Sequence, residues 1–139
     1  MINQTPKMTV SPFKHVPVAE AQADNPAFEH FRTSQLLAQA GKFAEACAAM
    51  QKAINLASVV TAVQNPLRPY LPHFWARKGS YYLGAGEYSK AIYTLQEAIS
   101  SLELHTGSEF HEDAVYMHKM IGKAHSKLAK QIVHDHKQE

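Results

Sequence analysis

The chain contains a single cysteine, Cys47, among its 139 residues. One cysteine excludes an intramolecular disulfide framework and a zinc site built from several cysteines. The chain also has no large net charge. Its 14 Lys and Arg residues nearly balance its 12 Asp and Glu residues, which leaves a net charge of +2. We therefore expect no nucleic-acid partner, since such partners favour strongly basic chains.

Apolar runs of transmembrane length are also absent from the sequence, and its first residues show no signal-peptide core. From these absences we expect no membrane partner and a cytoplasmic location. The length is sufficient for one domain with one hydrophobic core.

Catalytic motifs are missing too. The sequence has no P-loop, no dinucleotide-binding fingerprint, no G-x-S-x-G and no H-E-x-x-H. Cys47 lies in a run of alanines, which predicts a packed and unreactive thiol. We therefore expect no enzyme activity and no cofactor.

The nine histidines do not have the spacing of a metal site. His111, His118 and His125 are spaced seven residues apart, which corresponds to about 10 Å along a helix. Zinc holds its nitrogen ligands at about 2 Å, so neighbours in this set do not share one ion. His134 and His136 lie near the C-terminal end, where we expect only adventitious metal binding.

A pattern of small and aromatic residues occurs twice in the chain. Every member repeats after 45 residues, in the pairs Gly41 and Gly86, Phe43 and Tyr88, Ala46 and Ala91, Met50 and Leu95, and Ala53 and Ala98. Glycine suits a tight turn between helices because it adopts positive φ at little cost, and small residues let two helices approach closely. The repeat predicts two helical hairpins.

Prolines and helical periodicity set the expected boundaries. Residues 1–23 contain Pro6, Pro12 and Pro17, which predict an extended or disordered arm. Three further prolines in residues 64–72 predict a linker. Helices are expected over residues 26–40, 43–63, 73–83, 88–105 and 109–134, in a single domain of residues 24–134 followed by a frayed tail at 135–139. The last helix has an apolar stripe that predicts a capping role, formed by Met117, Ile121, Ala124 and Leu128.

Part of the second hairpin resembles the tetratricopeptide (TPR) signature W-x₂-L-G-x₂-Y…A-x₃-F, through Trp75, Gly79, Tyr82, Ala91 and Leu95. Lys78 stands where the signature has leucine, and Leu95 where it has phenylalanine. The 45-residue period is longer than the usual TPR period of about 34 residues. The resemblance implies an all-α fold of TPR-like antiparallel helical hairpins, with two long hairpins and a capping helix in a right-handed superhelical array.

Two groups of long-repeat relatives are similar in scaffold. Residues 107–114 resemble the loop between hairpins of kinesin light chain repeats, although Glu112 stands where that loop has proline. The stretch from residues 74–79 through His111 is similar to the C-terminal helical domain of the SET-and-MYND lysine methyltransferases. The zinc-binding cysteines and the SET domain of those enzymes have no counterpart here, so methyl transfer is not expected.

The resemblance implies that partners bind on a concave surface formed by the first helix of each hairpin. It places on or near that surface Phe31, Arg32, Gln35, Arg77, Ser80, Tyr116, Lys119, Lys123 and Lys127. Some TPR proteins grip the C-terminal carboxylate of a heat-shock chaperone with basic and amide side chains. Most of that clamp is missing here, so this particular partner is not expected.

Lys119, Lys123, Lys127 and Lys130 fall on one narrow face of the last predicted helix. Two interpretations of this face stay open: a track for an acidic peptide, or a solvated lysine face that keeps the protein soluble. The sequence thus predicts a non-catalytic adaptor or scaffold that binds a peptide or helix of another protein. A homo-oligomerisation module and a small enzyme that uses histidines or Cys47 are the alternatives.

Overall fold

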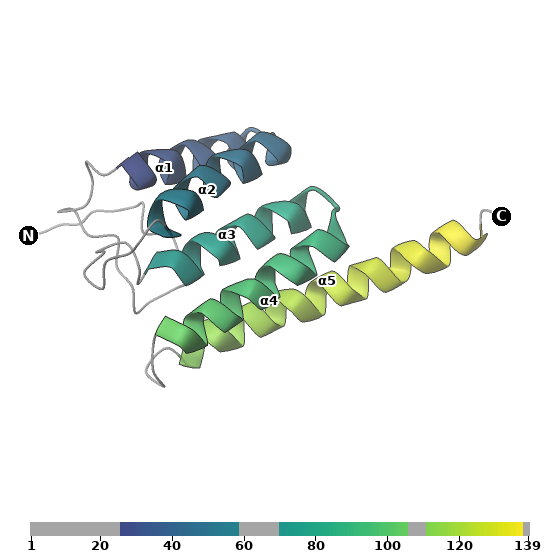
Figure 1. Cartoon of the computed structure of the whole chain (residues 1–139). Coiled ribbons are helices and arrows are strands. Elements are labelled where there is room, and N and C mark those ends of the chain that lie inside the picture. Colours follow the sequence, from purple (N-terminus) through teal and green to yellow (C-terminus); the bar gives the residue numbers. More distant parts are fainter. Residues whose placement is uncertain (1–25, 59–69, 106–110, 138–139) are drawn as a thin grey trace, which may run out of the picture.

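The computed structural model describes residues 26–58, 70–105 and 111–137. These residues form five α-helices and no strand, which confirms the expected all-α class. The helices are α1 (Pro26–Gln39), α2 (Phe43–Ser58), α3 (Leu71–Gly84), α4 (Tyr88–His105) and α5 (His111–Lys137). Figure 1 shows them packed side by side in chain order, with the end of α5 extending beyond the others.

Both expected turns have the same geometry. Gly41 and Gly86 adopt φ values of 80° and 82°, in the left-handed region that glycine enters most easily. The amide of Gly41 donates to the carbonyl oxygen of Ala38 at 2.9 Å, and the amide of Gly86 donates to that of Leu83 at 3.1 Å. The residue after each glycine donates to a carbonyl five positions earlier. The 45-residue offset is therefore present in the backbone of the two turns.

Small residues lie where the helices of each hairpin meet. A Cβ atom added at Gly79 would lie 2.7 Å from Cγ of Leu95, so α3 and α4 approach closely at this point only because residue 79 is glycine. Four alanines at equivalent places in the two hairpins are completely buried: Ala46, Ala53, Ala91 and Ala98.

Two hydrophobic clusters hold the helices together. The first joins α1, α2 and α3 around Phe28 and Phe74, whose rings meet edge to face with centroids 5.9 Å apart. The second joins α3, α4 and α5 around Leu95 and Met117. Trp75 of α3 packs against both clusters, so the helices form a continuous stack.

Among the described residues, the observed helix ends differ most from the predicted ones at the start of α3 and at the end of α5. Helix α3 begins at Leu71, before the expected start at His73, because Pro72 fits the first turn, where its missing N–H would have no helical acceptor. Helix α5 continues to Lys137, so residues 135–137 are helical instead of part of a frayed tail. The predicted arm at 1–23 and the predicted end of the second helix at 59–63 lie outside the described residues.

The two halves of α5 have different surroundings. Met117, Met120 and Ala124 are buried against the stack. Met117 and Ala124 belong to the predicted apolar stripe, and Met120 does not. Ile121 and Leu128 of that stripe are only partly buried, and the other residues from 125 to 137 are exposed. None of the five described helices is both long and apolar enough to cross a bilayer.

Candidate functional site

Phe31 belongs to the core and not to the partner surface on which the sequence placed it. Its side chain is 5% exposed, and its ring centroid lies 5.6 Å from that of Phe74 on α3. The Arg77 guanidinium lies over the same ring, 5.5 Å from its centroid. Phe31 therefore packs in the core, because side chains of α1 and α3 meet there. One face of its ring contacts the Arg77 guanidinium.

The other predicted site residues of α1 and α3 lie at the edge of this contact. Arg32, Gln35, Arg77 and Ser80 are each partly buried. The Ser80 hydroxyl donates to the carbonyl oxygen of Arg77 at 2.7 Å. The structure therefore leaves these side chains partly accessible.

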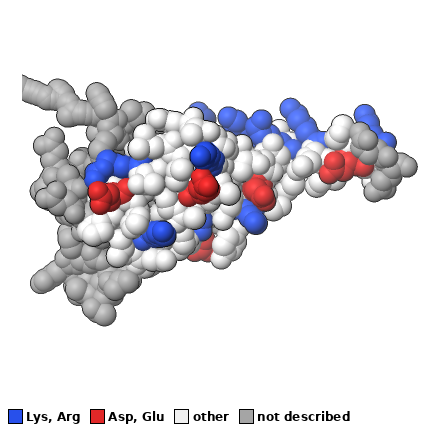
Figure 2. All heavy atoms as spheres, turned by 90° about the horizontal axis from the view of Figure 1, so that it is seen from above, with Lys and Arg blue, Asp and Glu red and all other residues white. Residues whose placement is uncertain are grey.

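The predicted site residues of α5 are exposed. Tyr116, Lys119, Lys123 and Lys127 are all in the exposed class, and none of these lysines forms an ion pair with another described residue. At about 100° per residue they lie along one flank of the buried stripe. Figure 2 shows Lys and Arg side chains gathered along one edge of the molecule toward the end of the projecting helix.

A buried polar pair joins α3 to α5. Nε2 of His73 lies 3.3 Å from Oδ2 of Asp113, and both side chains are almost completely buried. The pairing with His73 has no local signature, because it depends on which helix packs beside the first turn of α5.

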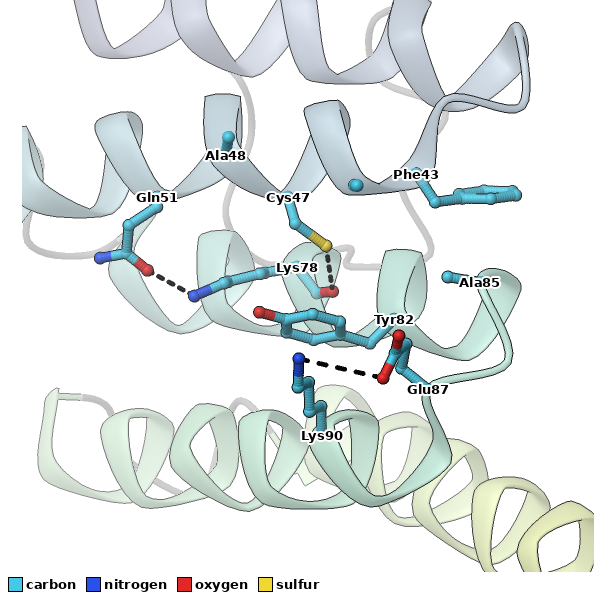
Figure 3. A pocket seen from close by; sticks show the side chains of 10 residues that line it. Phe43, Cys47, Ala48, Gln51, Lys78, Tyr82, Ala85, Glu87 and Lys90 are labelled. Atoms are coloured by element: carbon cyan, nitrogen blue, oxygen red, sulfur yellow. Dashed lines mark hydrogen bonds and ion pairs between the residues drawn. The ribbon is translucent and has the colours of Figure 1, made fainter.

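A second site, which the sequence analysis did not predict, is a pocket of about 410 Å³ between α2, α3 and α4. Figure 3 shows α2 on one side, α3 behind the pocket, and the turn before α4 on the other side. Its lining residues are Phe43, Ala44, Cys47, Ala48, Gln51, Lys78, Tyr82, Ala85, Glu87 and Lys90. We call this the Lys78 pocket. Lys78 and Tyr82 lie on the far side of α3 from Ser80, so the pocket is separate from the predicted partner surface.

Of the pocket residues that the sequence singles out, Lys78 is the one that departs from the TPR signature. It replaces the leucine of the TPR signature, which marks a position that packs between helices. Its ammonium group donates a hydrogen bond to Oε1 of Gln51 and lies 5.5 Å from the Trp75 ring centroid and 5.7 Å from that of Tyr82. Burial lowers the pKa of Lys78, because removal from water disfavours the charged amine.

The remaining polar groups of the pocket lie around Tyr82. Nζ of Lys90 is 5.8 Å from the Tyr82 ring centroid and 3.9 Å from Oε1 of Glu87. In Figure 3 the Tyr82 ring lies between the ammonium groups of Lys78 and Lys90. Burial raises the pKa of the Tyr82 hydroxyl.

Cys47 is buried at the back of the pocket, where its thiol donates to the carbonyl oxygen of Lys78 at 3.8 Å. Burial raises the pKa of this thiol, and the nearby Lys78 only partly offsets that effect. The burial of Cys47 confirms the predicted packing. Its low reactivity stays a prediction, which follows because a protonated thiol is a poor nucleophile. Within residues 26–58, 70–105 and 111–137, no three His, Cys, Asp or Glu side chains are arranged to hold a metal ion.

Comparison of the chain with protein-family models, curated proteins and solved structures gives no match. The geometry of the two surfaces described above is therefore the basis for assigning a function to the chain.

Proposed function

We propose that the protein is a non-catalytic, cytoplasmic adaptor that binds an acidic segment of a partner protein on the surface formed by α1, α3 and α5. The observation that supports this most directly is that Lys119, Lys123 and Lys127 are exposed and have no ion-pair partner among the described residues. Lysines repeated along one helix flank attract a run of carboxylates and orient it along the helix.

Arg77 supplies the second part of this proposal. Its guanidinium rests on the Phe31 ring, and a cation placed against an aromatic face loses less side-chain freedom when it binds a carboxylate. Because its helix lies between α1 and α5, Arg77 is well placed to contact the same acidic segment as the lysines. We assign the binding surface to Arg32, Gln35, Arg77, Ser80, Tyr116, Lys119, Lys123 and Lys127, and we call it the basic face.

The TPR assignment and the right-handed superhelix form part of the same proposal. Two findings support them: the hairpin turns repeat with a 45-residue offset, and Gly79 lies at a close helix contact. Repeat arrays of this type bind partners along surfaces formed by successive helices.

A fluorescein-labelled deca-glutamate peptide tests the basic face. The double variant Lys119→Glu, Lys123→Glu should bind this peptide at least about 10-fold more weakly than the wild type, mainly through slower association, since unlike charges steer the encounter. The wild-type affinity should fall with added salt, because exposed charges are screened over about 8 Å at physiological ionic strength.

The matched control is Lys42→Glu with Lys52→Glu, which makes the same charge change at two exposed lysines of the first hairpin. An equal loss of affinity in this control would mean that the weaker binding comes from the overall charge of the protein and not from the basic face. If the α5 variant is folded, with its helical signal intact, and binds the peptide as tightly as the wild type, the lysines form only a solvated face.

Self-assembly is the second candidate, because the projecting end of α5 exposes two neighbouring apolar side chains. Ile132 is 58% exposed and Val133 is 54% exposed. Light scattering over a concentration series separates the two functions: a mass that doubles in the wild type but not in Ile132→Glu favours self-assembly, and a constant monomer mass favours the adaptor.

A further inference from the structure

The Lys78 ammonium is a half-buried charge whose polar partner is neutral. Among the described residues, its hydrogen bond is to the Gln51 amide oxygen, and no carboxylate pairs with it. The π faces of Trp75 and Tyr82 stabilise the cation but do not neutralise it. A charge removed from water without a counter-ion is costly, so an anion that enters the pocket would be bound favourably.

The net charge of the pocket matches one negative charge on the ligand. Lys78 and Lys90 contribute two positive charges, and Glu87 removes one, since its carboxylate lies 3.9 Å from the Lys90 ammonium. A doubly charged phosphate would also lie near Glu87 and be repelled by it. A monocarboxylate neutralises the single excess positive charge of the pocket. It brings no second negative charge, which Glu87 would repel and which would have to lose its hydration.

The walls indicate what carries that carboxylate. The apolar lining of the pocket comes from the Phe43 ring, from Ala44 and Ala48 of α2, and from the Tyr82 ring. Figure 3 shows the Tyr82 ring beside Lys78 and the Phe43 ring at the Ala85 end of the pocket. The volume of about 410 Å³ lies within the range of about 300 to 1,000 Å³ that is usual for pockets of small ligands. Apolar walls around a small number of polar groups are typical of such pockets.

We propose that the Lys78 pocket binds a small organic monocarboxylate, whose carboxylate pairs with Lys78 and whose apolar or aromatic body lies against Tyr82. This inference does not depend on the basic face. It gives a function to the lysine at the position where the TPR signature has leucine, since a leucine would pack there between the helices without a desolvation cost.

The protonation of the groups that face the ligand sets the pH range for binding. Burial lowers the pKa of Lys78 and raises those of Cys47 and Tyr82, so the pocket is most cationic at neutral pH and below. As the pH rises through the lowered pKa of Lys78, the amine loses its charge and the affinity for a carboxylate should fall. Lys90 and Glu87 are the other charged groups at the rim.

The experiment uses the full chain, labelled with ¹⁵N, and the probe 4-phenylbutyrate. Titration followed by amide chemical shifts should move the signals of residues around Gln51, Lys78 and Tyr82 and leave those around Lys119 and Lys123 in place. The neutral isostere 4-phenylbutyramide should bind at least about 10-fold more weakly, because a charged hydrogen bond is lost. Inorganic phosphate should produce no shifts centred on the pocket.

Lys78→Met should weaken binding of 4-phenylbutyrate at least about 10-fold, whereas Lys119→Met, which removes the same charge on α5, should not. The wild-type comparison of acid and amide keeps the test valid even if Lys78→Met does not fold. Equal affinity for acid and amide, an unchanged affinity in folded Lys78→Met, or no shifts at the pocket would each overturn the proposal. Loss of deca-glutamate binding alone would affect only the basic face.

Discussion

The hairpins α1–α2 and α3–α4 share a turn but differ at equivalent positions of their first helices. By the 45-residue offset, Gly79 of α3 corresponds to Ser34 of α1. Gly79 leaves room for Leu95 of its own hairpin, whereas the hydroxyl of Ser34 lies 3.1 Å from that of Tyr81 in the other hairpin. Equivalent residues of the two hairpins therefore occupy the same place along their helices. Which contacts their side chains make depends on the helix that packs beside them.

The same contrast applies to Lys78 and its counterpart Thr33. Thr33 lies on α1, at the edge of the described stack, and is exposed. Lys78 lies on α3, which is covered by α2 on one side and α4 on the other, and is partly buried. A polar residue at this register position is harmless in the first helix, but it has a desolvation cost in the third.

The largest effect is expected from Gly79→Leu, which places a branched side chain where even a Cβ atom would lie 2.7 Å from Leu95. Overpacking of this kind should lower the free energy of unfolding by roughly 1–3 kcal/mol or more, measured by urea titration. The control is Gly122→Ala on α5, where the new Cβ meets no atom within 4 Å. An unchanged urea midpoint in Gly79→Leu would contradict the close contact between α3 and α4.

The two turns should respond equally to the loss of glycine. Gly41→Ala and Gly86→Ala each force a Cβ into the left-handed region and should each cost about 1–2 kcal/mol. A difference of more than about 1 kcal/mol between the two variants in thermal denaturation would mean that the turns are not energetically equivalent, despite their shared hydrogen bonds.

Ser34→Ala and Tyr81→Phe test the hydrogen bond between the Ser34 and Tyr81 hydroxyls, which joins the two hairpins. Each single variant should cost about 1 kcal/mol, because it removes the hydroxyl pair or leaves a buried hydroxyl without that partner. In the double variant the losses should not add, since both remove the same interaction. Full additivity in a urea-denaturation cycle would show that the two hydroxyls do not interact.

Lys78→Leu should have an effect of the opposite sign, a stabilisation of about 0.5–2 kcal/mol, because it removes a half-buried charge at a position that suits leucine. The folded state lowers the pKa of Lys78 below its ordinary value of 10.5, so the unfolded chain binds more protons between these two values. The contribution of Lys78 to stability therefore rises with pH across that window.

The pH effect is measured as the difference between the wild type and Lys78→Leu. This subtraction is needed because the raised pKa values of Tyr81 and Tyr82 change stability in the opposite direction. A stability advantage of Lys78→Leu that shrinks as the pH approaches 10.5 is the expected result. An advantage that grows over the same range would mean that the pKa of Lys78 is raised in the folded protein.

Much of the fold was predictable because its signals are local. Positive φ at Gly41 and Gly86 follows from the steric freedom of glycine, and the predicted helix over residues 88–105 is confirmed at both ends. The start of α3 was predicted two residues late, since a proline was taken as a break although the first turn of a helix accepts it.

The candidate sites were less predictable. Phe31 was expected at a partner surface, but its ring packs against Phe74 of α3. The pairing of Asp113 with His73 had no signal in the sequence. The lysine at the leucine position of the TPR signature was visible in the sequence, yet one wall of its pocket comes from α2 of the other hairpin.

The sequence by itself thus determined the five helices, the two glycine turns and the small residues at the hairpin contacts, because sterics and helical periodicity act within a few residues of the chain. The tertiary structure alone decided the burial of Phe31, the pairing of His73 with Asp113 and the pocket around Lys78. Each of these depends on which helices stack against one another, and desolvation acts on a side chain only after that stacking has removed it from water.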